Sequence, residues 1–154
     1  LAAEEFGGEV HVFSPAYKPA EIIQLLKISD HIVFNSLGQW KRYREEVLTS
    51  ERPVSPGLRI NPEYAEAVAE IYNPCAPGSR FGVLASLMND DDLEGIEGLH
   101  FHTLCEQGAD ALERTLEHVI VLSFLTLGGQ RLYFLQNFPD VFEETIASLL
   151  ILIE

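Results

Sequence analysis

Short apolar runs alternate along this chain with segments whose apolar side chains recur at helical spacing. The runs have the length and composition of buried strands, and they lie at residues 10–13, 32–34, 58–60, 98–104 and 121–127. The intervening segments predict helices entered at Pro19, spanning 39–48, starting within 81–87, and beginning near Asp110 and Asp140. A strand that alternates with a helix throughout predicts an α/β fold with a parallel sheet and crossover helices.

Each predicted helix has an apolar side of its own. Trp40, Tyr43 and Val47 share one side of the second helix, and Leu112, Leu116 and Val119 share one side of the fourth. The first helix is expected to bury its apolar residues, which are Ile22, Ile23, Leu26 and Ile28. Asp110 and Asp140 each precede a glutamate by three residues, the spacing of a capping box at a helix start. The acidic run 89–92 is predicted to be a solvated turn, because it lacks the spaced ligands of a calcium loop.

The stretch 98–107 combines an apolar strand with polar chemistry at its exit. Alternation places His100 and His102 on one face, and Leu99 and Phe101 on the other. A thiol and a carboxylate follow in the next turn. In parallel α/β folds ligands bind at the carboxyl ends of the strands, so this exit is the predicted site.

Composition narrows the possible functions. The formal net charge of −14 over 154 residues leaves no basic stripe for nucleic acid, and it suits a cationic small molecule. Two cysteines do not form a disulfide framework, which favours a reducing compartment. The start of the chain has no signal-peptide pattern, and the longest apolar run, 119–127, is too short to cross a bilayer. We therefore expect neither a nucleic-acid nor a membrane partner.

Five segments in one order, 10–18, 30–36, 57–64, 73–82 and 98–107, resemble the carboxynorspermidine/carboxyspermidine decarboxylases. These are pyridoxal-phosphate enzymes of polyamine synthesis with an alanine racemase-like barrel. The resemblance runs to about His118, and residues 119–154 agree thinly with it. It implies one domain over 1–154 that is part of a (β/α)8 TIM-type barrel, since a closed barrel needs about 250 residues.

The resemblance also implies roles for single residues. His102 would lie against the cofactor ring, and Arg59 would lie beneath the cofactor pocket. Taken alone, His102 could instead be a strand histidine bonded to a neighbouring carbonyl, and Arg59 a surface ion pair. Cys105 and Glu106 would belong to the wall of the catalytic site, although a free cysteine is more often an inert buried thiol.

Gly128 and Gly129 end a predicted strand, where the resemblance places contacts to the cofactor phosphate. Such a pair is also common in plain turns, and residues 130–134 replace the longer glycine run and histidines of the family. A zinc site at Cys75, His100, His102 and Cys105 matches no zinc spacing, so no metal site is predicted.

The three lysines, Lys18, Lys27 and Lys41, do not lie on strands, unlike the Schiff-base lysine of the family. We therefore expect that this chain alone does not decarboxylate. The complete protein would convert carboxynorspermidine or carboxyspermidine to the triamine and carbon dioxide, as a cytoplasmic homodimer. The alternatives are a sister decarboxylase acting on diaminopimelate, ornithine or arginine, and a barrel that binds pyridoxal phosphate without catalysis.

Overall fold

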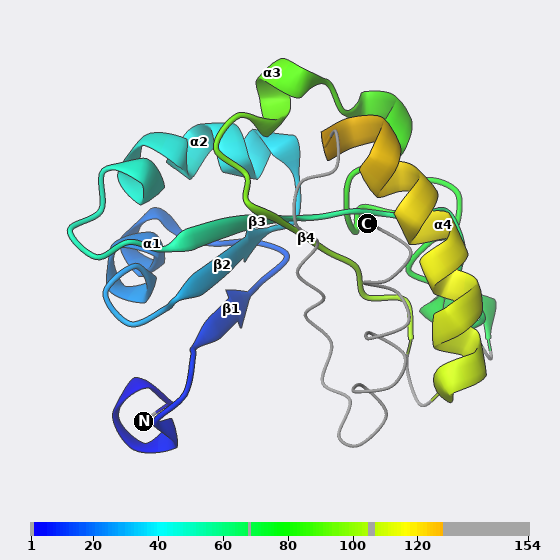
Figure 1. Ribbon diagram of the computed structural model, residues 1–154, viewed down its shortest axis with the longest axis horizontal. Helices are drawn as coiled ribbons and strands as arrows, with labels where there is room; N and C mark the ends of the chain where they lie inside the picture. The colour runs from blue at the N-terminus through cyan, green and yellow to red at the C-terminus, as the bar shows by residue number, and fades with distance from the viewer. Residues whose placement is uncertain (1, 68, 105–106, 128–154) are drawn as a thin grey trace.

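The computed structural model describes residues 2–67, 69–104 and 107–127, and its centre is a parallel sheet (Figure 1). The four strands lie side by side in chain order, and every neighbouring pair is parallel. They are β1 (His11–Phe13), β2 (His31–Phe34), β3 (Ser55–Arg59) and β4 (Gly98–His100). The prediction of an α/β fold with a parallel sheet is confirmed.

Four α-helices connect or follow these strands in the described residues, together with several short helical turns. The α-helices that pack on the sheet are α1 (Pro19–Leu25), α2 (Leu37–Leu48) and α4 (Ala109–Leu127). The shorter elements are the π-helix η1 (Ala2–Phe6), the 3-10 helices η2 (Glu70–Tyr72) and η3 (Ala85–Leu87), and α3 (Asp90–Leu93). None of the helices in the described part of the chain combines the length and the apolar character that a bilayer crossing requires.

One face of the sheet forms the hydrophobic core with the helices. Alternate strand residues, among them Ile32, Phe34, Leu58 and Leu99, belong to the buried cluster. The helices contribute Ile22 and Leu26 from α1, Trp40, Tyr43 and Val47 from α2, and Leu112, Leu116 and Val119 from α4. Figure 1 shows α2 above the strands and α4 along the right of the view. The predicted apolar sides of α2 and α4 are confirmed.

The opposite face presents its residues in layers, because parallel strands in register point their paired residues the same way. The register pairs His11 with His31 at the amino ends of the strands, and Arg59 with His100 at the carboxyl ends. Arg59 and His100 therefore lie at the exit of the sheet, as predicted, whereas the predicted Cys105 and Glu106 lie outside the described residues.

The apolar side of α1 is smaller than predicted. Ile22 and Leu26 are buried, but Ile23 is 55% exposed and Ile28 is 43% exposed. A helix of two turns packs only one narrow side against the sheet. Ile23 lies about 100° around the helix axis from the buried Ile22, and so faces away from the core. Ile28 lies beyond the end of the helix, so neither residue reaches the core.

The prediction of a strand at 121–127 is wrong, because α4 continues as a helix to Leu127. A short apolar run does not distinguish a buried strand from a buried helix, and no proline or glycine interrupts 109–127. The capping box at Asp110 is also wrong in detail, because Asp110 is the second residue of the helix. The first turn closes instead on Gly108, whose carbonyl accepts from the N–H of Ala111.

Two predictions between β3 and β4 need correction. In place of a helix over 81–87, Val83 bridges to Ile60 and only Ala85–Leu87 form a helical turn. The acidic run is the short helix α3 rather than a turn, since the side chain of Asn89 caps it by accepting from the N–H of Asp92. The helix predicted from Asp140 lies outside the described residues.

Candidate ligand-binding site

A cavity of about 690 Å³ opens at the carboxyl ends of the strands. Phe13 and Arg59 reach it from the last residues of β1 and β3, and Phe81 reaches it from the loop that follows β3. The segment after β4 contributes His102, Thr103 and Gln107. The cavity is within the size range of small-molecule sites, about 300–1,000 Å³.

Arg59 is the charged group among the described residues that line this cavity, and only 5% of it is exposed. Its guanidinium carbon lies 5.2 Å from the ring centre of Phe13 and 5.0 Å from that of Phe81. Its Nη2 donates to the carbonyl of His102 at 3.3 Å. Among the described residues no carboxylate forms an ion pair with Arg59, so a buried cation faces a cavity without an anionic partner there.

Burial also shifts the proton affinities of the groups around Arg59. Desolvation lowers the pKa of the Arg59 guanidinium from its usual value, and the nearby Cys75 thiol opposes that shift. Burial raises the pKa of the Cys75 thiol, against the backbone N–H of Tyr64 and the charge of Arg59. Cys75 therefore stays a neutral thiol near pH 7, and it is not an activated nucleophile.

His100 and His102 lie on the face predicted for them, with Leu99 and Phe101 buried in the core on the other. The His100 ring is buried and stacks on Phe13 at 4.9 Å between centres, and it lies 6.2 Å from the His102 ring. Desolvation by the cavity lowers the pKa of His102, and the positive charge of Arg59 lowers it further. His102 therefore presents a neutral, flat ring at pH 7.

Thr103 and Gln107 are site residues that the sequence did not single out. Within the described part of the chain, the buried Oγ1 of Thr103 and Oε1 of Gln107 have no hydrogen-bond partner, and both residues line the cavity. Buried polar atoms are normally paired, so these two indicate a polar ligand. No motif or spacing in the sequence marks either residue as part of a site.

The loop at 61–82 closes over the site and is fixed at its base. The N–H of Asn61 donates to the carbonyl of Val83 at 2.8 Å, and the N–H of Val83 donates to that of Arg59 at 2.9 Å. The buried Asn35 side chain donates to the carbonyl of Arg80 at 2.9 Å and accepts from the N–H of Gly82 at 3.2 Å. This loop therefore holds Phe81 against Arg59.

Gly82 is required at that position for two reasons. Its φ is +80°, and a Cβ there would lie 2.7 Å from the backbone carbon and oxygen of Ile60. Only glycine combines a left-handed backbone with so close an approach.

A second anchor joins the same loop to α4. Arg114 Nη2 donates to Glu66 Oε2 at 2.8 Å, and the Tyr64 hydroxyl donates to the Glu66 carboxylate. The Tyr64 ring stacks on His118 at 4.2 Å between centres. Hydrogen bonds from Arg114 and then Tyr64 lower the pKa of Glu66 to about 2.

The structure brings together two of the predicted site residues, Arg59 and His102. Cys105, Glu106, Gly128 and Gly129 lie outside the described residues. Of the four residues considered for zinc, Cys75, His100 and His102 are described, and they do not converge on a common point.

Comparison with known proteins gave several relatives but no matching protein-family model. The chain is 44% identical over 146 residues to "Carboxyaminopropylagmatine decarboxylase" of Synechocystis, a match to 90% of this chain and 37% of that protein. It is 46% identical over 117 residues to "Carboxynorspermidine/carboxyspermidine decarboxylase" of Campylobacter jejuni, covering 76% of this chain and 30% of that protein. The chain thus spans about a third of the length of these relatives.

A solved structure is also similar. It is carboxynorspermidine decarboxylase of Campylobacter jejuni in complex with norspermidine, with a TM-score of 0.64 and 38% sequence identity. The match covers 82% of this chain and 30% of that one.

Proposed function

Because this chain belongs by sequence to the carboxynorspermidine/carboxyspermidine decarboxylase family, we propose that its cavity binds pyridoxal phosphate together with a carboxylated polyamine. The relatives are named decarboxylases, so the family is enzymatic. The reaction proposed for the complete protein releases carbon dioxide and leaves a polyamine. The resemblance seen in the sequence predicted the same family.

The observation that carries this proposal is that Arg59 is buried with no carboxylate paired to it among the described residues, in a cavity where two described polar atoms lack a hydrogen-bond partner. A guanidinium in such a place is stabilised by an anionic oxygen, and both the cofactor phosphate and the substrate carboxylate provide one. The Thr103 hydroxyl and the Gln107 amide supply further hydrogen bonds to a polar ligand. The residues present therefore fit this cofactor.

The roles of the described residues follow from their chemistry. Arg59 would bind an anionic oxygen of the ligand, held in place by the rings of Phe13 and Phe81. His102 would lie against a flat ring and exclude water, since its imidazole stays neutral. When bound, pyridoxal phosphate supplies an electron sink for the electron pair left by the departing carboxylate. Roles for Cys105, Glu106, Gly128 and Gly129 remain predictions from the resemblance.

The positions of the lysines limit what this chain does alone. Lys18 pairs with Glu21 and Lys41 with Asp92, both at exposed sites, and Lys27 is exposed on the surface. None of the three lines the cavity. We therefore propose that this chain holds the cofactor without a covalent bond and does not decarboxylate by itself.

The substrate of the complete protein belongs to one class with two candidates. The Campylobacter relative is named for carboxylated triamines, and the Synechocystis relative is named for a carboxylated agmatine derivative. Both substrates join a carboxylate to a cationic chain, which suits Arg59 and the net charge of −14. The carboxylated agmatine derivative is favoured, because the Synechocystis relative that is named for it matches 90% of this chain. Turnover of each by the complete protein decides between them, and turnover of diaminopimelate, ornithine or arginine instead would refute the class.

The cofactor proposal is tested by titrating the purified chain with pyridoxal phosphate and following its absorbance. We expect saturable binding that Arg59→Met weakens at least about tenfold, which corresponds to the loss of about 1.4 kcal/mol. Arg80→Met is the matched control, because Arg80 also lies over Phe81, at 5.4 Å, but is exposed. Equal affinities for wild type, Arg59→Met and Arg80→Met would contradict the proposal.

A homodimer and a cytoplasmic location for the complete protein also belong to this proposal. The support is the resemblance and the presence of Cys75 as a free thiol. Light scattering of the complete protein measures its subunit number.

A further inference from the structure

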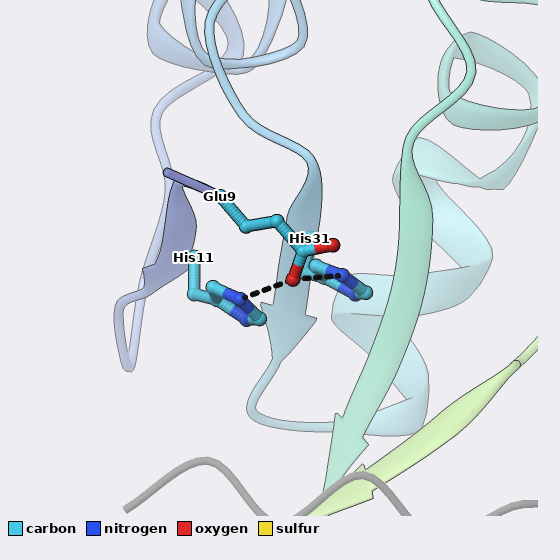
Figure 2. A group of neighbouring side chains, drawn as sticks. All are labelled: Glu9, His11 and His31. Carbon is cyan, nitrogen blue, oxygen red and sulfur yellow. Dashed lines mark hydrogen bonds and ion pairs between the residues drawn. The ribbon is translucent and has the colours of Figure 1, made fainter. Parts of the chain in front are cut away.

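A cluster of metal-binding side chains lies at the end of the sheet opposite the cavity. It is made of Glu9, His11 and His31 (Figure 2), and we refer to it as the amino-end cluster. His11 and His31 are the first residues of β1 and β2, and they are register partners in the parallel pair. Their side chains therefore leave the sheet on the same face, directly beside each other.

The geometry of the cluster is close to that of three ligands around one ion. Glu9 Oε2 lies 3.3 Å from His11 Nε2 and 3.6 Å from His31 Nε2, and all three ligand atoms lie within 4.8 Å of one another. In a tetrahedral site with bonds of about 2.0–2.2 Å, ligand atoms lie about 3.3 Å apart. Bonds at the long end of that range put the ligand atoms about 3.6 Å apart, so the two separations from Glu9 Oε2 already fit, and rotation of the imidazoles brings their Nε2 atoms closer.

The orientation of the side chains agrees with a shared ligand. The two imidazoles stack with 4.2 Å between centres and an angle of 6° between their planes. Figure 2 shows the Glu9 carboxylate between the two rings, with one oxygen, Oε2, in contact with Nε2 of each. The His11 side chain is 31% exposed and that of Glu9 is 70% exposed, so an ion and its remaining water ligands have access.

We propose that the amino-end cluster binds Zn²⁺ or a divalent cation of similar softness. Two imidazole nitrogens and one carboxylate are a zinc ligand set, and they leave a fourth position for water. Hard cations such as Mg²⁺ prefer all-oxygen sites, so they bind poorly to this ligand set. The sequence analysis considered zinc only at His100, His102 and the two cysteines.

The site is structural, because it lies away from the cavity. β1 is a strand of three residues at the edge of the described sheet. A cation would bind residues of β1, β2 and the segment before β1 together, and the folded state would be stabilised more as the cation concentration c rises, by RT ln(1 + c/Kd).

Calorimetric titration of the purified chain with Zn²⁺ alone, after treatment with a chelator, tests the proposal. We expect one ion per chain, a rise in Tm of several degrees, and no binding of Mg²⁺. His11→Ala and His31→Ala should weaken Zn²⁺ binding at least about 10–100-fold. Glu9→Gln should weaken it as well, and this exposed change leaves the packing intact.

His118→Ala and Glu5→Gln are the matched controls, because each removes an exposed side chain of the same type elsewhere. Both should bind Zn²⁺ as the wild type does. The proposal is overturned if Zn²⁺ does not bind below millimolar concentration. It is also overturned if Glu9→Gln and the histidine variants bind as tightly as the controls.

Discussion

Arg59 shows how a single residue combines a structural cost with a function. Removing a guanidinium from water is unfavourable, and here Phe13 and Phe81 replace part of the lost hydration. His102, whose carbonyl accepts from Arg59, brings a neutral ring to the same cavity. These residues come from the ends of β1, β3 and β4 and from a loop, so the site depends on the sheet register.

His102→Ala should weaken the binding of pyridoxal phosphate several-fold without a large loss of stability. The variant removes a flat ring from the cavity, and 102 is an exposed position. Absorbance titration measures the affinity, and His11→Ala is the control, since it removes an exposed imidazole at the opposite end of the sheet. Affinity equal to that of the control would exclude His102 from cofactor binding.

Gly82→Ala should destabilise the chain by about 2 kcal/mol more than Gly78→Ala. Both glycines have a left-handed backbone, with φ of +80° and +79°, but only a Cβ at Gly82 meets backbone atoms within 4 Å. The conformational cost of about 1–2 kcal/mol is thus common to both variants. Urea unfolding measures the difference, and equal midpoints would show that the loop shifts to accept the methyl group.

The sequence predicted some of these residues and not others for a physical reason. The roles of Arg59 and His102 are predicted from the family resemblance, and the two-residue period of a strand, which is local information, places His102 on one face with His100. Thr103 and Gln107 acquire their role only when the loop at 61–82 covers them. The contact of these two residues with a loop distant in sequence leaves no residue pattern near position 103.

At the scale of elements, local signals explain the start of α2 well. Ser36 has an extended backbone, and its Oγ accepts from the N–H of Gln39 at 3.2 Å. Trp40, Tyr43 and Val47 then follow at helical spacing and enter the core. Local signals do not identify the structure of the run at 121–127. The spacing of its apolar residues fits a helix as well as a strand. The continuous helix α4 depends on its packing, which begins at Leu112 and Leu116.

Ser36→Ala should lower the free energy of unfolding by about 1 kcal/mol, because it leaves the N–H of Gln39 without its cap. Ser36→Asn should retain most of the stability, since asparagine caps equally well. Thermal unfolding compares the three proteins. If Ser36→Ala and Ser36→Asn lose the same amount, the hydrogen bond from Gln39 contributes nothing.

At the scale of the whole molecule, Glu66 joins the cavity loop to α4 and makes stability depend on pH. Its pKa is lowered to about 2 by hydrogen bonds from Arg114 and Tyr64. An unfolded glutamate has a pKa of about 4.3. A lowered pKa contributes stability that is complete above the unfolded value and disappears as the pH falls toward 2.

Glu66→Gln should therefore lower the urea midpoint at pH 7, and the difference from wild type should shrink steadily between about pH 5 and pH 2. Glu97→Gln is the control, because it removes an exposed carboxylate that lies outside this network. A constant difference between wild type and Glu66→Gln across that range would show that the ionised Glu66 does not stabilise the fold.

The closed base of the loop at 61–82 has a consequence for how this molecule can change over evolutionary time. The backbone hydrogen bonds among Arg59, Asn61 and Val83 complete the loop before β4 begins. Chain can therefore be inserted or deleted at its tip without moving the register of the strands, and the entropy cost of a longer loop grows only slowly with length. A new preference for one cationic chain over another can arise in this loop while the sheet and Arg59 stay unchanged.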